Sequence, residues 1–214
     1  MAAAIYLVRH GESLGNQKNV YLGNRVDWDL SQRGFEQAER LADYFKTTAL
    51  DAVYTSPLLR AYHTAEPTAQ QHHLTLRLCP QLHEIEAGDW EGRTYDEIAR
   101  EDPERWQAWL DASPEVRAAG GENAAEVFRR SWQALCDIAR ENDGKSVLVV
   151  THCVVLRTLI CRLMGKSLEQ LSQVPFVGNA SVSLAVFEKA SASLRFCDER
   201  SHLGALATAL PPQF

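Results

Sequence analysis

The chain repeats one local pattern, in which a short apolar segment ends in polar residues and leads into a helical stretch. Segments 5–8, 52–55 and 146–150 show it, and they lead into Arg9-His10, Ser56 and Thr151-His152. Short apolar runs bounded in this way are typical of buried strands in a parallel sheet. Alternating strands and helices predict an α/β domain, whose ligands bind beyond the carboxyl ends of the strands. The three polar segments are therefore expected to meet at one edge of the sheet.

Other elements follow from periodicity and capping residues. Ser31 can cap a helix, and the expected apolar face of that helix consists of Phe35, Ala38, Leu41, Ala42 and Phe45. A second helix is expected from residue 58, and Pro67 should kink or end it. Further helices are expected at 122–142 and 155–164, and further strands at 74–78, 182–187 and 193–196. Segment 81–97 contains two glycines and clustered acids, and it fits no regular element.

The length and composition of the chain fit one domain over residues 1–214. Within it, the helices of residues ~90–122 are expected to form a lid-like insertion and residues ~203–214 a tail. A net charge of −6 argues against general nucleic-acid binding, and no segment has the long apolar run of a membrane span. Five cysteines without CxxC spacing, and no basic leader, predict a cytoplasmic protein. Monomer and homodimer are both compatible with the sequence.

Two different active sites can be drawn on the segment "IYLVRHGESLGN". Gly11 to Gly15 fits the G-x-S-x-G pattern of a serine hydrolase, with Ser13 as the nucleophile. That fold needs several strands before the serine, whereas only one short strand precedes Ser13 here. A serine esterase would also leave Arg9 and Arg60 without a task, so it stays a minor alternative.

The second interpretation uses more of the chain and is phosphoryl transfer. A phosphate dianion taken out of water needs fixed cations, and the planar guanidinium groups of Arg9 and Arg60 suit its oxygens. His10 can attack phosphorus with a neutral ring nitrogen if a backbone carbonyl holds the other nitrogen. His152, at the end of another strand, is expected to act as a charged donor to the phosphoryl oxygens.

The departing alkoxide needs a proton, and Glu84 in the acidic loop is the candidate donor. Glu84 must then stay protonated near the working pH, through partial burial or through acidic neighbours such as Glu86. It would next act as the base toward the water that attacks the phosphohistidine. Four tryptophans, Trp90, Trp106, Trp109 and Trp132, are expected to be packing residues, and His202 lies in a tail that either folds over the pocket or frays.

Several blocks of the sequence together resemble the histidine phosphatase superfamily, which has the phosphoglycerate-mutase-like fold. The blocks are "LVRHGES" with Asn16, "DLSQRGFEQA", "AVYTSPLLRAYHTAEP", "LHEIEAGDWEGRTYDEI", "GGEN" and "VLVVTHCVVLR". They cover most of the chain in the family's order. The resemblance implies a single three-layer α/β domain with a mostly parallel central sheet. Within the family, the sequence looks like the compact bacterial phosphatases.

The resemblance also implies a role for individual residues. His10 would be the phosphorylated nucleophile, Arg9, Arg60 and His152 would complete the phosphate pocket, and Glu84 would donate the proton. Asn16 and the backbone at Cys153 would touch phosphate or substrate. Many members carry glycine where this chain has Cys153. Members of the family need no metal, no cofactor is expected for this chain, and the sequence has no HExxH motif or P-loop.

The expected function is therefore metal-independent hydrolysis of a small phosphomonoester through a phosphohistidine. The alternatives are a cofactor-dependent phosphoglycerate-type mutase and a catalytically weak, phosphatase-like binding module. The chain lacks the longer insertions of mutases, which favours the phosphatase. Sugar phosphates, phosphoglycerates, phosphoserine and nucleoside-related phosphates are all compatible with the sequence.

Overall fold

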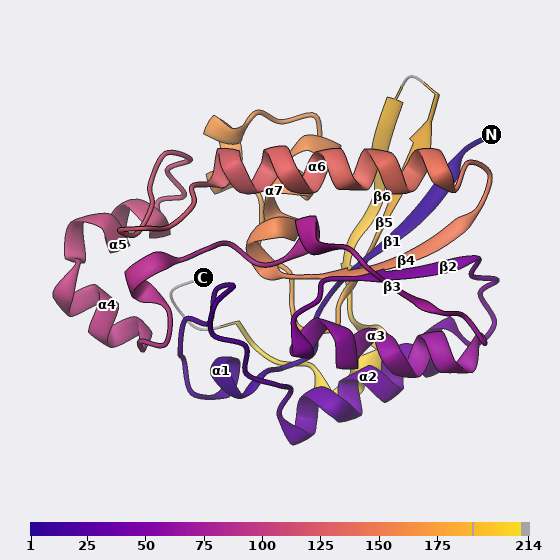
Figure 1. The fold of residues 1–214 in the computed structure, drawn as a ribbon, viewed down its shortest axis with the longest axis horizontal. Helices are drawn as coiled ribbons and strands as arrows, with labels where there is room; N and C mark the ends of the chain where they lie inside the picture. The colour runs from indigo at the N-terminus through magenta and orange to yellow at the C-terminus, as the bar shows by residue number, and fades with distance from the viewer. Residues whose placement is uncertain (190, 211–214) are drawn as a thin grey trace.

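The computed structural model describes residues 1–189 and 191–210, and in this part of the chain one sheet lies between two layers of helices (Figure 1). The strands are β1 (Ala3–Arg9), β2 (Ala52–Thr55), β3 (Leu76–Leu78), β4 (Ser146–Thr151), β5 (Val182–Glu188) and β6 (Ser191–Glu199). The helices are α1 (Leu14–Gln17), α2 (Gln32–Phe45), α3 (Leu59–Gln71), α4 (Tyr95–Glu101), α5 (Pro103–Leu110), α6 (Ala124–Glu141) and α7 (Cys153–Leu163).

The described strands form a six-stranded sheet in the order β3-β2-β4-β1-β5-β6. Strands β1 to β4 are parallel, whereas β5 runs antiparallel to β1 and β6 antiparallel to β5. The register aligns Arg9 with Thr151 and Thr55 with Val150. The mostly parallel α/β fold is thus confirmed, and the carboxyl ends of β2, β4 and β1 lie side by side.

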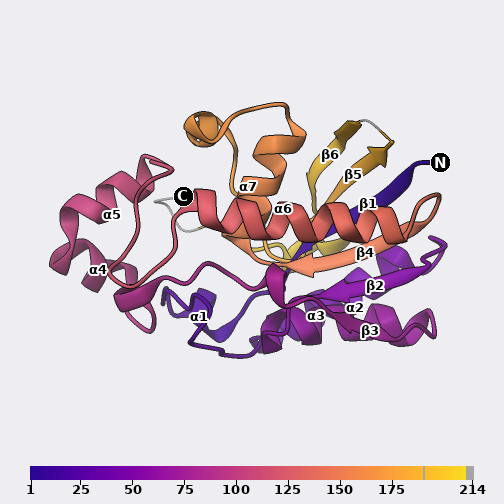
Figure 2. The ribbon, with the colours of Figure 1, turned by 45° about the horizontal axis from the view of Figure 1, so that its top comes forward.

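Each face of the sheet has its own hydrophobic core, because successive strand residues point to opposite faces. In β4, Leu148 and Val150 pack with α2 and α3, whereas Val147 and Val149 pack with α6 and α7. All four are fully buried. Figure 2 shows the same arrangement, with α6 and α7 on one side of the sheet and α2 and α3 on the other.

Helix α2 begins after Ser31, whose hydroxyl accepts the N–H of Gly34 at 3.1 Å. Leu41 and Phe45 are fully buried as expected, but Phe35 is 41% exposed, so its assignment to the apolar face was wrong. Phe35 lies in the first turn, where its ring packs 5.8 Å from the ring of His63 on α3, not on the sheet.

Helix α3 passes through Pro67 and continues to Gln71, so the proline does not end it. The buried small residues Ala61, Ala65 and Ala69 hold this helix against the core, and this packing outweighs the loss of one backbone hydrogen bond at the proline. The two β-strands expected near the C-terminus are confirmed as an antiparallel pair, both longer than the pattern indicated.

Segment 81–97 is more regular than expected. It contains a 3-10 turn at Gly88–Trp90, and α4 begins inside it at Tyr95. Thr94 and Glu97 cap that helix reciprocally, a Thr-x-x-Glu signature that the sequence analysis missed. Helices α4 and α5 project from one end of the domain, away from the sheet (Figures 1 and 2). No helix in the described ranges is long and apolar enough to cross a bilayer.

Candidate active site

The loop after β1 is held so closely that two glycines are required. A Cβ on Gly11 would lie 2.7 Å from the carbonyl oxygen of Gly34, and a Cβ on Gly34 would lie 2.0 Å from that of Glu12. The N–H of Gly11 donates to the Thr64 hydroxyl of α3 at 2.9 Å. The backbone around His10 is therefore fixed by α2 and α3 as well as by the strand that precedes it.

His10 is 4% exposed, and its Nδ1 lies 2.7 Å from the carbonyl oxygen of Gly11. Because a carbonyl can only accept, Nδ1 carries the proton and Nε2 carries the lone pair. Burial, followed by the nearby charges of Arg60 and Arg9, holds the pKa of His10 well below its usual value of 6.5. At neutral pH the ring is therefore uncharged and has a defined tautomer.

His152 follows β4, and its Nε2 lies 2.7 Å from the hydroxyl oxygen of Ser56 after β2. Its ring centroid is 5.2 Å from that of His10, while its buried Nδ1 has no hydrogen-bond partner among the described residues. Burial, then Arg60 and His10, lower the pKa of His152 well below 6.5. Burial and the nearby charge of Arg60 therefore favour the uncharged ring, and the charged donor expected from the sequence stays a prediction for the phosphate-bound site.

Arg60 stands in the first turn of α3 and is 1% exposed. Its Nη2 donates to the carbonyl of Gly23 at 2.7 Å, and its Nη1 lies 3.4 Å from Asp27 Oδ1. Arg9 donates from Nη1 to the carbonyl of Val177 at 2.6 Å, and its buried Nε has no partner within the described chain. Backbone carbonyl groups thus orient both guanidinium groups, and each guanidinium still has N–H groups that can donate to a ligand.

Glu84 is 7% exposed, and its carboxylate meets the beginning of α7. Oε2 accepts the N–H of Val154 at 3.3 Å, and Oε1 accepts the N–H of Ile85 at 2.9 Å. Arg130 of α6 donates to the Glu84 carbonyl at 3.1 Å and so holds its backbone. Glu86, the acidic neighbour considered from the sequence, lies 4.0 Å from Arg25 instead.

One cavity of about 200 Å³ joins these groups. Its wall includes six of the seven site residues expected from the sequence, namely Arg9, His10, Asn16, Arg60, Glu84 and Cys153. The seventh, His152, is fully buried and lies behind the wall beside His10. Burial raises the pKa of the Cys153 thiol, so this wall residue is uncharged.

Asn16 accepts at Oδ1 from the backbone and hydroxyl of Ser13 and from Nδ2 of Asn179, each at 3.1 Å. Asn179 was missed by the sequence analysis, although it also donates to the carbonyl of His10 at 3.1 Å. It lies in an irregular loop before β5, where no periodicity or motif marks it. Asn16 and Asn179 together connect the loop after β1 to the C-terminal third of the chain.

Several other wall residues were unexpected. Tyr21, Tyr95, Trp109 and Phe176 line the cavity, and so do Thr208, Ala209 and Leu210 of the tail. The interpretation of Trp109 as a packing residue alone was therefore incomplete. His202, in contrast, packs its ring 4.8 Å from that of Tyr44 on α2 and is not part of the wall.

Ser13 does not have the surroundings of a serine nucleophile. Its fully buried hydroxyl caps α1 by accepting the Asn16 N–H, and it donates to Asn16 Oδ1. Within the described residues, no histidine is among its hydrogen-bond partners. The structure therefore gives the G-x-S-x-G match a structural role.

Several known proteins are similar to this chain in sequence and fold. The family described as "Histidine phosphatase superfamily (branch 1)" matches residues 5–199. "Phosphoserine phosphatase 1" of Hydrogenobacter thermophilus is 33% identical, over 94% of this chain and 94% of the relative. "Adenosylcobalamin/alpha-ribazole phosphatase" of Escherichia coli is 32% identical, over 78% and 82%. Among solved structures, Bacillus stearothermophilus YhfR superposes with a TM-score of 0.89 at 31% identity, over 94% of this chain and 99% of that one.

Proposed function

Because the chain belongs to the histidine phosphatase superfamily and is a phosphatase of small phosphorylated metabolites, we propose that it acts through a covalent phosphohistidine at His10. The observation that carries this mechanism is the buried, neutral His10, whose Nδ1 is held by Gly11 while Arg9 and Arg60 stand beside it. A neutral ring with a fixed lone pair is a nucleophile, and two buried cations provide the anion site that phosphate needs.

In the first half-reaction, Arg9 and Arg60 bind the nonbridging oxygens of the phosphoryl group. Nε2 of His10 attacks phosphorus, the bond to the ester oxygen breaks, and Glu84 gives that oxygen a proton. The products are the free alcohol and an Nε2-phosphohistidine. Glu84 suits this step because it is buried in the same cavity and its backbone is held by Arg130.

In the second half-reaction, the Glu84 carboxylate takes a proton from water as the water oxygen attacks phosphorus. The bond between phosphorus and Nε2 breaks, and His10 returns to its neutral form while phosphate leaves. His152 supports both steps as a positioning residue beside His10, and a phosphate dianion near it would raise its pKa and strengthen it as a donor. None of these steps requires a metal ion or cofactor.

We also propose a cytoplasmic location. The five cysteines Cys79, Cys136, Cys153, Cys161 and Cys197 are all free thiols. Free thiols persist in a reducing compartment, which supports this proposal.

The test is phosphate release from a panel of metabolite phosphomonoesters in EDTA, with wild type, His10→Ala and the control His63→Ala. His63 is partly exposed and paired with Asp29 at 2.7 Å, outside the cavity wall. Release that is lost in His10→Ala and kept in His63→Ala supports the mechanism. Full turnover by His10→Ala refutes it, and phosphate transfer to 3-phosphoglycerate from a bisphosphate primer, without net release, indicates a mutase.

A further inference from the structure

Beyond the phosphate end, the described wall of the cavity offers no positive charge to a substrate. Arg9 and Arg60 are the cations among its described wall residues, and the proposed mechanism uses both for phosphate. The remaining charged wall residues are Glu12 and Glu84. Glu12 is paired on its own side of the wall, with Ser31 at 2.6 Å and Arg33 at 3.5 Å. A carboxylate on the substrate would therefore meet acids and no free cation.

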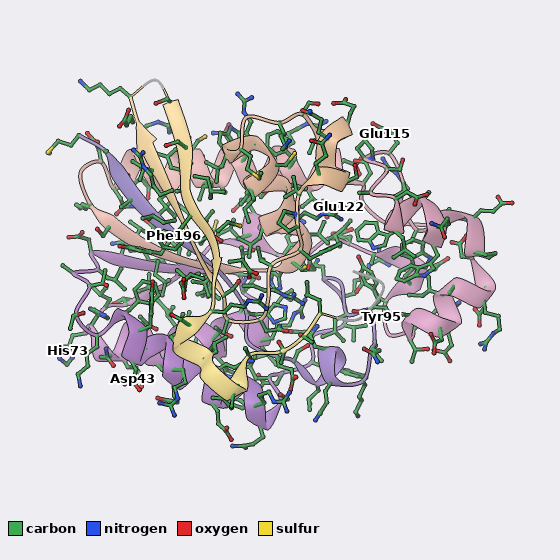
Figure 3. The ribbon with its side chains drawn as sticks, turned by 180° about the vertical axis from the view of Figure 1, so that it is seen from behind. Asp43, His73, Tyr95, Glu115, Glu122 and Phe196 are labelled. Carbon is green, nitrogen blue, oxygen red and sulfur yellow. The ribbon has the colours of Figure 1, made fainter. Side chains whose placement is uncertain are left out.

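The rest of the wall combines uncharged polar side chains, such as Asn19, Asn179 and Thr208, with aromatic rings from four separate segments. Tyr21 follows α1, Tyr95 begins α4, Trp109 is in α5, and Phe176 lies in the loop before β5. Figure 3 labels Tyr95 and shows ring-bearing side chains gathered next to α4 and α5. Val20, Leu22, Val154 and Leu210 add apolar surface. This composition suits a ring more than a polar chain.

These rings are held in place by contacts with one another and with Trp106. Tyr21 meets Tyr95 and Trp109 edge to face, with centroids 6.2 and 5.9 Å apart. Tyr95 also stacks on Trp106, 5.8 Å away and 20° from parallel. Such contacts fix the orientation of each ring before a ligand binds.

Phe176 is held from the opposite side by Arg157, whose guanidinium carbon lies 3.9 Å from the ring centroid. Arg157 donates to the carbonyls of Val174 and Leu171, each at 3.1 Å, and it does not line the cavity. The cation therefore stiffens the aromatic wall without offering its charge to the substrate.

Both tyrosines of the wall stay neutral at any ordinary assay pH. Burial raises the pKa of Tyr21 well above its usual value and that of Tyr95 to about 12. Their hydroxyls can hydrogen-bond to a neutral substrate group, but they supply no charge.

We propose, on the basis of the phosphatase function above, that the preferred substrates are phosphomonoesters whose alcohol portion carries an uncharged aromatic ring or heterocycle. The ring would lie against Trp109 and Phe176, with Tyr21 and Tyr95 completing the site. Phosphorylated amino acids and sugar acids are disfavoured, because burying their carboxylate without a cation is costly.

The test compares kcat/KM for 2-phenylethyl phosphate, ethyl phosphate, phosphoserine and 3-phosphoglycerate. All four release a primary alcohol, so their departing groups are similar. We expect 2-phenylethyl phosphate to exceed the other three by about tenfold, as one aromatic contact of about 1.4 kcal/mol provides. A phosphoserine or 3-phosphoglycerate value equal to or above that of 2-phenylethyl phosphate overturns the proposal.

Substitutions of Trp109 and Phe176 test whether the aromatic wall causes the preference for 2-phenylethyl phosphate. Trp109→Leu and Phe176→Leu should each lower the ratio of kcat/KM between 2-phenylethyl and ethyl phosphate by about five- to tenfold, and Trp109→Phe should restore most of it. Trp132→Leu is the control, since Trp132 packs against Phe128 and Phe187 outside the cavity. An unchanged ratio in both leucine variants overturns the proposal.

Failure of the mechanism can be told apart from failure of this inference. If His10→Ala still hydrolyses the esters, the phosphohistidine is refuted while the ratios still measure ring preference. If no ester is hydrolysed, quenching of tryptophan fluorescence gives the binding constants of 2-phenylethyl and ethyl phosphate directly. Tighter binding of the phenylethyl ester supports the aromatic site, and equal or weaker binding refutes it.

Discussion

The substitution Arg60→Lys separates the shape of the guanidinium group from its charge. Arg60 reaches two fixed acceptors, Gly23 O at 2.7 Å and Asp27 at 3.4 Å, and its side chain is only 2% exposed. These contacts set the plane of the group, so that its remaining N–H groups can meet phosphate. A lysine ammonium is a single point, and it cannot hold Gly23 and phosphate in the same geometry.

The expected loss is about one charge-assisted hydrogen bond to the phosphoryl group, roughly 1.5–3 kcal/mol. This corresponds to a fall in kcat/KM of about 10- to 150-fold, with part of it in kcat because charge moves onto these oxygens during transfer. Arg60→Met should lose about tenfold more, since it removes the charge as well.

The assay is continuous phosphate release at fixed ionic strength, with thermal unfolding of each variant measured in parallel. Arg77→Lys is the control, because Arg77 binds the Tyr54 hydroxyl at 2.8 Å and does not line the cavity. If Arg60→Lys stays folded and keeps kcat/KM within twofold of wild type, the guanidinium group does not hold the phosphoryl group and the assignment is wrong.

Three further results are expected. Glu84→Gln should slow the first half-reaction, measured as single-turnover release of the alcohol, by about 10²- to 10³-fold on alkyl phosphates but much less on 4-nitrophenyl phosphate, whose leaving group needs no proton; equal losses in this step would argue against a proton donor. The folded-state pKa values of His10 and His152 lie below 6.5, so below pH 6.5 only the unfolded chain takes up protons at these rings. The free energy of unfolding should therefore be highest above pH 6.5. At lower pH it should fall by up to about 1.4 kcal/mol per pH unit for each ring. Urea unfolding at several pH values measures this, and His152→Gln should show a shallower decline than wild type; identical slopes would contradict the burial argument. EDTA should leave activity unchanged and vanadate should inhibit competitively, so activity lost in EDTA and restored by magnesium would refute the metal-independent mechanism.

Local sequence patterns were enough to locate the strand ends and most of the proposed site. His10 and His152 directly follow the buried strands β1 and β4, and Arg60 lies in the first turn of the helix that follows β2, so their positions follow from the strand assignments. Parallel strands bring their carboxyl ends to one edge, which explains why separate segments met as expected. Phe35 was misassigned because helical periodicity predicts only the direction in which a side chain points around the helix. It does not predict which element packs against each turn.

Only the tertiary structure determined the electrostatics and the far wall of the cavity. The neutral state of His152 depends on its burial beside Arg60, and the support of Glu84 depends on Arg130, which is 46 residues away in the chain. The aromatic wall likewise joins Trp109 and Phe176 from segments with no shared motif. Sequence periodicity predicts which residues are buried, because the preference of a side chain for water or for the core depends on the residue itself and on its neighbours in the chain. Charge states and cavity shape depend on which distant residues come into contact, and only the folded chain establishes those contacts.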